Sequence, residues 1–289
     1  MMPGMTVDII QRPVDTGDVR LNVATAGDGP PVLLLHGFPD SWLVWRYQIE
    51  ALATAGYRVV APDLRGFGES DPPAEVAGYT VDKLLGDVLA VCADAGITRT
   101  PVVGHDWGAS LAWQLAFHRP ELVERLAVLS VGHYAAGVAA GWEQRRLSWY
   151  MLWFQFPGVA EAVFPAQDWR LYREWAWGGA GPGEHPECER QIADLSRPGA
   201  LTAALNWYRA NIKPERYVVP ELPAAPRVRC PTLGIWSSGD EFVGEAQMRG
   251  SGGYVDGPWR YERVDGGHWI PTSAPEAVNR LLLEFLPAP

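Results

Sequence analysis

The first 132 residues alternate short apolar runs with stretches of helix length, and this alternation limits the fold more than any other feature of the sequence. The runs rich in valine, leucine and isoleucine predict six strands: Val7–Gln11, Arg20–Ala24, Val32–Leu35, Arg58–Ala61, Thr100–Val103 and Arg125–Ser130. Amphipathic stretches between the later runs predict three helices: Trp42–Ala55, Val81–Ala95 and Ala109–Phe117. Strands that alternate with helices indicate parallel βαβ units, and apolar runs suit strands buried on both faces. The first two runs have no helix between them and predict an antiparallel hairpin at the sheet edge.

The alternation stops near His133 and resumes near residue 220. Between these points, pieces punctuated by glycine and proline predict four short helices: Trp142–Phe156, Asp168–Trp177, Pro186–Leu195 and Ala200–Ile212. A stretch from Pro214 to Pro231 is typical of a return linker, because it contains Pro220, Pro223 and Pro226. The pattern then resumes with two strands and a helix: Thr232–Ser237, Arg260–Val264 and Ala274–Phe285. We therefore expect an α/β core of residues 1–132 and 220–289, with a helical cap of residues 133–219 inserted after the sixth strand.

Composition excludes several classes of protein. The 289 residues include 24 Lys+Arg and 34 Asp+Glu, and the net charge of −10 argues against nucleic acid or an anionic membrane as a partner. With 47% hydrophobic residues the chain can bury a large core, which excludes intrinsic disorder. No run approaches a membrane helix, and Met1–Pro13 shows no secretory signal. Three widely spaced cysteines, Cys92, Cys188 and Cys230, indicate reduced thiols, so we expect a cytoplasmic protein.

The segment Gly104-His105-Asp106-Trp107-Gly108 is the strongest chemical motif. It follows an apolar run directly and opens a helical stretch, which is the setting of a nucleophile elbow. There, flanking glycines allow a strained turn that exposes the central side chain, here Asp106. Read alone, the same aspartate could equally cap the helix that follows.

Three further features fit this setting. The loop His36-Gly37-Phe38-Pro39 follows an earlier buried strand, where one oxyanion-hole N–H is expected, and the residue after the nucleophile supplies the other. Phe38 and Trp107 are the predicted donors. His268, after the last strand, is a candidate general base, and Asp240, after the strand before it, would orient the imidazole. Each feature alone also fits an ordinary turn or surface residue, and Glu241 competes with Asp240, but the chain order nucleophile, acid, histidine is that of α/β-hydrolases.

An aspartate nucleophile restricts the reaction. A carboxylate that attacks an ester carbonyl forms an anhydride and gains little. Attack on a saturated carbon forms a stable alkyl ester, which water activated by His268 can then hydrolyse. The sequence therefore favours epoxides, alkyl halides or similar electrophiles as substrates.

At this point the chain resembles the epoxide hydrolase branch of the α/β-hydrolase superfamily, with haloalkane and haloacetate dehalogenases as near relatives. The segments that carry the resemblance are His36–Pro39, Asp63–Ser70, Gly104–Gly108 and Gly267-His268-Trp269. The family also has two cap tyrosines that protonate the opening epoxide oxygen. The segments Trp149–Gly158 and Leu205–Arg209 look like those that carry them, which implies this role for Tyr150 and Tyr208. A phenol suits that role because ring opening creates an alkoxide, although either tyrosine could instead be a core residue of a helix.

The tryptophans leave one alternative open. Seven of the 14 lie in the expected cap: Trp142, Trp149, Trp153, Trp169, Trp175, Trp177 and Trp207. Most of them fit aromatic packing, but a cap over an aspartate nucleophile must also form a dry chamber. We expect a substrate pocket lined by His36, Pro39, Trp107, Trp153 and Trp269. Haloalkane dehalogenases use a tryptophan after the nucleophile, as Trp107 is here, and a second donor that is either an asparagine or a cap tryptophan.

The resemblance implies an enzyme that opens epoxides to vicinal diols through an ester on Asp106, with haloalkane dehalogenation by the same residues as the alternative. A non-catalytic scaffold would predict decay of a catalytic position, and all three are present. The partners expected are a small apolar or aromatic epoxide and water. We expect no cofactor and no metal, because no metal-ligand cluster or dinucleotide fingerprint is present. The oligomeric state is open, a homodimer included.

Overall fold

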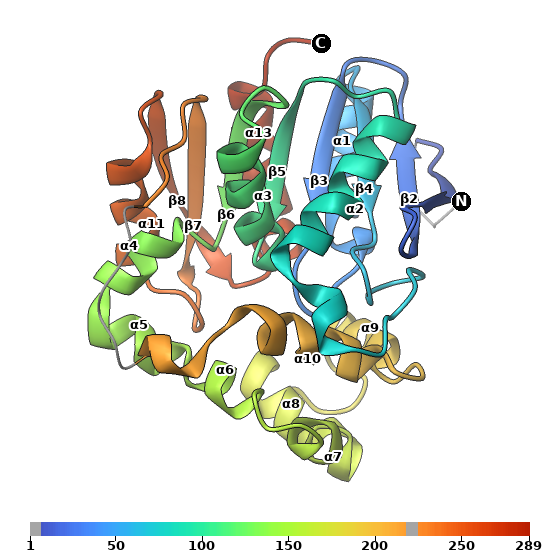
Figure 1. Cartoon of the computed structure of the whole chain (residues 1–289), viewed down its shortest axis with the longest axis vertical. Helices are drawn as coiled ribbons and strands as arrows, with labels where there is room; N and C mark the ends of the chain where they lie inside the picture. The colour runs from blue at the N-terminus through green and yellow to red at the C-terminus, as the bar shows by residue number, and fades with distance from the viewer. Residues whose placement is uncertain (1–6, 218–224) are drawn as a thin grey trace.

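The structure, a computed structural model, describes residues 7–217 and 225–289 and is built on an eight-stranded sheet (Figure 1). The strands follow the order β1-β2-β4-β3-β5-β6-β7-β8 across the sheet. Their bounds are β1 (Ile10–Asp15), β2 (Arg20–Ala26), β3 (Pro31–Leu35), β4 (Arg58–Pro62), β5 (Thr100–His105), β6 (Val123–Leu129), β7 (Thr232–Gly239) and β8 (Trp259–Gly267). This order agrees with the sequence, which predicts the first two strands at one edge of the sheet, and it places the last two strands at the other edge.

The edge hairpin is also confirmed. Strand β2 pairs antiparallel with β1 on one side and with β4 on the other, and all other pairs in the sheet are parallel. Strand β1 begins at Ile10, later than the predicted Val7, and it continues through Pro13 to Asp15. Proline lacks an N–H for the ladder, so it is tolerated here because β1 has a partner on one side only.

Helices cover both faces of the sheet. Two of them, α1 (Arg46–Thr54) and α13 (Pro275–Phe285), pack on one face. The opposite face carries α2 (Val81–Asp94) and α3 (Trp107–His118). Residues 32–35 of β3 are fully buried between these layers, as their uninterrupted apolar run predicts. The predicted helix Trp42–Ala55 is divided into a 3-10 turn, η1 (Trp42–Trp45), and α1.

The described part of the segment between β6 and β7 is mainly helical, with one isolated bridge from Val228 to Val255. It contains α4 (Tyr134–Ala139), α5 (Gly141–Leu147), α6 (Trp149–Trp153), α7 (Val159–Val163), α8 (Ala166–Trp177), α9 (Pro186–Leu195), α10 (Ala200–Asn211) and the turn η3 (Pro214–Tyr217). We call α4–α10 the inserted helices. The prediction of one helix over Trp142–Phe156 is wrong, because the chain breaks at Ser148 between α5 and α6. Helices α4 and α7 have six and five residues and are too short to show a period in the sequence.

The rest of the chain returns to the sheet. Pro220 and Pro223 of the predicted linker lie outside the described residues. Between β7 and β8 lie α11 (Glu245–Gly250) and η4 (Ser251–Tyr254), and α12 (Ile270–Ser273) leads into α13. One further 3-10 turn, η2 (Val76–Tyr79), precedes α2.

The inserted helices lie across the carboxyl ends of the parallel strands (Figure 1). Arg190 of α9 pairs with the buried Asp40, which follows β3. The indole Nε1 of Trp207 in α10 donates to the carbonyl of Arg65, which follows β4, at 3.0 Å. Open α/β sheets place their sites at this end, so these helices cover the region where the candidate residues are expected.

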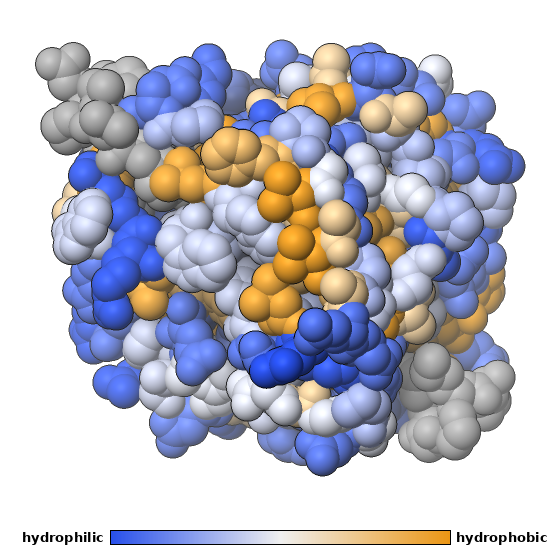
Figure 2. All heavy atoms as spheres, turned by 90° about the horizontal axis from the view of Figure 1, so that it is seen from below, coloured by the Kyte–Doolittle hydropathy of each residue, from blue (hydrophilic) through white to orange (hydrophobic). Residues whose placement is uncertain are grey.

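The outer face of the inserted helices has an exposed apolar band (Figure 2). Phe156 is 61% exposed, and Val159 and Val163 of α7 are also exposed. Within the described ranges, no helix is long and apolar enough to cross a membrane.

Glycine to alanine substitution in two helices tests the packing of α3 on the sheet. A Cβ at Gly108 would overlap the backbone carbonyls of Leu35 and His36, whereas Gly86, exposed in the interior of α2, has open space around it. We expect Gly108→Ala to destabilise the fold by more than about 3 kcal/mol, because backbone atoms cannot move aside. Gly86→Ala should stabilise it by about 1 kcal/mol through helix propensity. Urea unfolding midpoints measure both effects, and equal shifts in the two variants would contradict this packing.

Candidate active site

Asp106 occupies a strained turn between β5 and α3. Its φ of 52° and ψ of −119° lie outside the regions that most residues with a side chain adopt. The turn is possible because its neighbours lack side chains. A Cβ at Gly104 would overlap the backbone of Gly108, and a Cβ at Gly37 would overlap the Asp106 side chain. The glycines predicted to permit this turn are therefore required by direct close approaches.

The Asp106 carboxylate has a defined partner on each oxygen. Oδ1 accepts a hydrogen bond from the backbone N–H of Phe38 at 2.8 Å, and Oδ2 lies 3.6 Å from Nε2 of His268. Burial would raise the pKa of Asp106, but the hydrogen bond and charge of His268 outweigh it, and the pKa is lowered overall. The group is thus a carboxylate at neutral pH. Trp107 is the first residue of α3, where a backbone N–H has no carbonyl partner within the helix.

His268 and Asp240 lie side by side, each directly after the end of one of two neighbouring strands. Strands β7 and β8 pair at Gly239 and Gly267, so the next residue of each strand faces the other. Nδ1 of His268 lies 2.9 Å from Oδ2 of Asp240, whose side chain is fully buried, while Glu241 is exposed. Burial lowers the pKa of His268, but the charges and hydrogen bonds of Asp240 and Asp106 raise it to about 10. The imidazole is therefore protonated at neutral pH and lies between two carboxylates.

Two residues to which the sequence motifs assign no role, His105 and Ser130, bind the backbone of His268. The carbonyl of His268 accepts from Nε2 of His105 at 2.9 Å and from the hydroxyl of Ser130 at 3.0 Å. Burial lowers the pKa of His105 to about 4, so its ring is neutral and donates through Nε2. Ser130 follows β6 in the same way that Asp106 follows β5, and nothing in its local sequence marks this contact.

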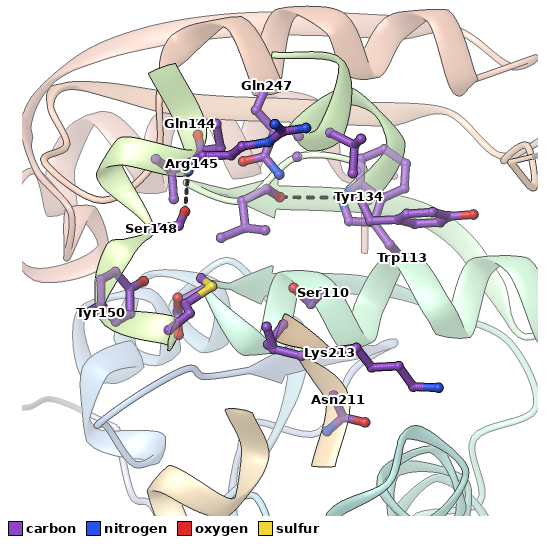
Figure 3. Close-up of a pocket in the computed structure, with 18 of the residues that line it drawn as sticks. Ser110, Trp113, Tyr134, Gln144, Arg145, Ser148, Tyr150, Asn211, Lys213 and Gln247 are labelled. Atoms are coloured by element: carbon purple, nitrogen blue, oxygen red, sulfur yellow. Dashed lines mark hydrogen bonds between the residues drawn. The ribbon is translucent and has the colours of Figure 1, made fainter. Parts of the chain in front are cut away.

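Tyr150 of α6 and Tyr208 of α10 approach the same region from different inserted helices. Both are buried, and their ring centroids are 6.0 Å apart. The ring of Tyr208 meets that of Trp107 edge to face at 5.0 Å. Tyr150 and Asp106 line one cavity, and Figure 3 shows the phenol oxygen of Tyr150 directed toward it. Tyr150 thus shares a cavity with Asp106, while Tyr208 contacts the ring of the residue after Asp106 and is not among the residues that line that cavity.

A cavity of about 270 Å³ extends from Asp106 along α3 (Figure 3). Its walls include Trp113 of α3, Gln144 of α5 and Val243 after β7. None of the five residues expected to line the pocket does so in the described structure: His36, Pro39, Trp107, Trp153 and Trp269.

These five residues make contacts elsewhere in the structure. Nε2 of His36 accepts the N–H of Leu64 at 2.8 Å, and burial lowers the pKa of its ring. Pro39 follows a cis peptide bond after Phe38. Trp107 packs against Tyr208, as described above.

The two remaining tryptophans contact the inserted helices. The ring of Trp153 stacks on Trp149 of the same helix at 6.3 Å and meets the ring of Phe164, which directly follows α7, edge to face. The ring of Trp269 stacks on Trp177 with centroids 4.5 Å apart. The assignment of these residues to the pocket remains a prediction that the cavity lining does not support.

Two aromatic residues near the site were not predicted. Phe242 places its ring 5.1 Å from that of His268 and 5.8 Å from that of Tyr150. Trp175 of α8 lies 4.9 Å from Tyr150 and 5.1 Å from Phe242. The tryptophan cluster in the sequence signalled an aromatic layer here, but not which member would reach the site. Across residues 7–217 and 225–289, no group of three His, Cys, Asp or Glu side chains is arranged to hold a metal ion.

The combination of a parallel sheet, a strained elbow and a histidine–carboxylate pair after the last strands defines a class of protein. A family described as alpha/beta hydrolase fold matches residues 30–275, and the chain belongs to this family.

Its relatives include several epoxide hydrolases. "Epoxide hydrolase 3" of Mus musculus is 33% identical over 98% of this chain and 78% of its own length. "Epoxide hydrolase A" of Mycobacterium tuberculosis is 33% identical over 96% of this chain and 97% of its own. A relative with a general name, "AB hydrolase superfamily protein YfhM" of Bacillus subtilis, is 34% identical over 94% of this chain and 96% of its own. Among solved structures, epoxide hydrolase A from Mycobacterium thermoresistibile superposes with a TM-score of 0.81 at 31% identity, covering 96% of this chain and 98% of that one. These similarities support an α/β-hydrolase enzyme.

The raised pKa of His268 predicts a pH dependence of stability. Because its pKa is about 10 in the folded protein and 6.5 ordinarily, the folded state binds the proton more tightly. The resulting stabilisation is complete below pH 6.5 and is lost as the pH rises toward 10. We expect the free energy of unfolding of the wild type to fall over this range relative to that of His268→Gln, as measured by urea unfolding. Parallel pH curves for the two proteins would show that His268 is not held between charged carboxylates.

Proposed function

We propose that this protein opens epoxides to vicinal diols through a covalent alkyl ester on Asp106. The observation that carries the proposal is the buried, ionised Asp106 in a strained turn, with a backbone N–H on one oxygen and His268 beside the other. The names of the relatives, epoxide hydrolases among them, agree with this chemistry.

In the first step the carboxylate of Asp106 attacks one epoxide carbon. A carbon–oxygen ester bond forms as the epoxide carbon–oxygen bond breaks, and the electron pair remains on the epoxide oxygen. Tyr150 and Tyr208 are the proposed donors of a hydrogen bond and a proton to this oxygen, since an alkoxide is a poor leaving group. The tyrosinate left behind recovers a proton and the imidazolium of His268 gives one up and becomes neutral, with water in the cavity as the proposed carrier between them.

Ester formation itself prepares His268 for the second step. Asp106 loses its negative charge in the ester, and His268 then loses one of the two carboxylates that raise its pKa. The neutral imidazole takes a proton from water while the hydroxide adds to the ester carbonyl. The backbone N–H groups of Phe38 and Trp107 are the proposed donors to the tetrahedral oxyanion. Collapse releases the diol alkoxide, which takes the proton from the new carboxyl group and restores the carboxylate.

We further propose that the inserted helices are a cap domain of residues 133–219 over a core of residues 1–132 and 220–289. Their contacts with Asp40 and Arg65 support this division, since both core residues follow strands at the site. The cavity beneath the cap carries Trp113, Val138 and Met151 among its walls, which suits a small apolar or aromatic epoxide.

Haloalkane dehalogenation is the alternative with the same nucleophile. It requires two N–H donors for the halide, and the cap tryptophan next to Trp107, Trp207, already donates its Nε1 to Arg65. This removes Trp207 as the second donor, and Trp175 of α8 is then the cap tryptophan nearest Tyr150 that could serve. The pair of phenols at Tyr150 and Tyr208 favours epoxides, because halide release does not require a proton donor.

Isotope labelling tests the covalent step. After many turnovers in ¹⁸O-water, we expect the peptide that carries Asp106 to gain ¹⁸O, because hydrolysis of the ester places a water oxygen in the carboxylate. Mass spectrometry of that peptide and of the diol measures both products. Labelled diol together with an unlabelled Asp106 would mean direct attack by water and would end this proposal.

Removal of the two phenols tests the epoxide assignment. We expect Tyr150→Phe/Tyr208→Phe to lower the rate of epoxide opening at least about a hundredfold, because the alkoxide loses its proton donors. A panel that scores diol and halide together measures the effect. Tyr172→Phe is the matched control, since it removes a buried phenol from α8 that already donates to Gln191 and is not part of the cavity lining. A double variant that opens epoxides as fast as wild type would refute the roles of both tyrosines.

A further inference from the structure

Gln144, on the inserted helix α5, pairs with the backbone after β7. Its Oε1 accepts the N–H of Gly244 at 2.9 Å, and its Nε2 donates to the carbonyl of Phe242 at 3.0 Å. The side-chain amide thus binds both sides of Val243, as a neighbouring strand would. The two partners lie about 100 residues away along the chain.

The backbone that Gln144 binds also fixes the orientation of the Asp240 side chain. We call residues 240–244 the acid loop. Oδ1 of Asp240 accepts from the N–H groups of Phe242 at 2.9 Å and Val243 at 3.0 Å, which leaves Oδ2 for His268. The carbonyl of Val243 accepts from the indole of Trp236 at 2.8 Å. A shift of Phe242 or Gly244 would therefore change the direction in which Asp240 presents Oδ2.

The same amide reaches the helix that carries Tyr150. Nε2 of Gln144 donates to the hydroxyl of Ser148 at 2.8 Å, and Ser148 directly precedes α6 (Figure 3). One side chain thus connects the acid loop, which orients His268, with the start of the helix that places Tyr150.

We infer that Gln144 is a positioning residue that aligns the Asp240–His268 pair with the inserted helices, so that base and phenol are in place together. The inference rests on the proposed two-step reaction and adds a residue that acts on its second step through Asp240. Gln144 does so by holding the acid loop from the side of the cap.

A primary amide suits this position because it donates and accepts at once. Methionine has a similar length and can do neither. Glutamate can accept from Gly244 but cannot donate to Phe242, and it adds a negative charge beside the acid loop. The titratable groups that face His268 are Asp106, Asp240 and His105, and the ester removes the charge of Asp106.

The two variants should shift the pH dependence of ester hydrolysis, the second step, in opposite directions. In Gln144→Met the acid loop loosens, Asp240 supports the imidazolium less, and the rise of ester hydrolysis with pH moves to lower pH. The plateau rate should fall about tenfold, in line with the loss of the two hydrogen bonds to the acid loop. In Gln144→Glu the added charge favours the imidazolium, so the rise moves to higher pH.

Asn211→Leu is the matched control. Asn211 is a second amide on the inserted helices that binds core backbone, with the carbonyl of Tyr79 at 2.8 Å and the N–H of Val81 at 3.1 Å. Its partners belong to η2 and α2, not to the acid loop. The Asn211→Leu variant measures how much a weaker contact between the inserted helices and the core slows the reaction. It should leave unchanged the pH at which the rate of ester hydrolysis rises.

The experiment is a single-turnover reaction with styrene oxide, quenched at intervals, in which intact mass follows formation and decay of the adduct on Asp106. Opposite pH shifts for Gln144→Met and Gln144→Glu, with none for Asn211→Leu, support the inference. Equal decay rates and unshifted profiles in both Gln144 variants overturn it, as do shifts that match those of Asn211→Leu. Wild-type protein that forms ¹⁸O-labelled diol while the Asp106 peptide stays unlabelled over many turnovers refutes the proposed function instead, so the two failures are distinct.

Discussion

The structure depends on one buried arrangement of charge, an imidazolium between two carboxylates. Burial alone would remove the proton from His268, and an uncompensated charge of this kind costs several kcal/mol. Asp240 and Asp106 reverse that preference and raise the pKa of the ring to about 10. In turn His268 keeps the pKa of Asp106 low despite burial. Each of the three charges is tolerated because of the others. The proposed ester on Asp106 would therefore lower the pKa of His268 directly.

The sheet explains how three charges from distant parts of the chain meet. Asp106, Asp240 and His268 follow β5, β7 and β8, whose carboxyl ends lie at one edge. The pairing of Gly239 with Gly267 sets Asp240 beside His268 with no further adjustment. Asp106 lies two strands away from β7 and reaches His268 because its strained turn projects the carboxylate beyond the end of β5. The strain at Asp106 is thus part of what brings the charges together.

The sequence predicts those parts of the molecule whose signals are local. Apolar runs locate the strands, and glycines on both sides of Asp106 locate the turn, because the physical requirement acts within a few residues. The break at Ser148 shows the opposite case. Residues 142–156 carry no glycine or proline that would end a helix. At the break the hydroxyl of Ser148 instead accepts a hydrogen bond from Gln144, which also accepts one from the N–H of Gly244. The contacts of His105 and Ser130 with His268 are equally non-local, so no motif within one segment of the sequence predicts them.

The aromatic layer shows why composition locates a site more readily than it assigns its walls. A large aromatic ring buries much apolar area, and only two side-chain torsions are fixed when it packs. Such rings therefore suit the uneven space between short helices and a sheet edge. Any of several rings can fill a given gap, and the choice depends on helix directions that short segments do not encode. Trp153 stacks within the inserted helices, while Phe242 reaches His268. Packed rings such as that of Phe242 help to bury His268, and burial away from bulk water strengthens the charge interactions on which His268 and Asp106 depend.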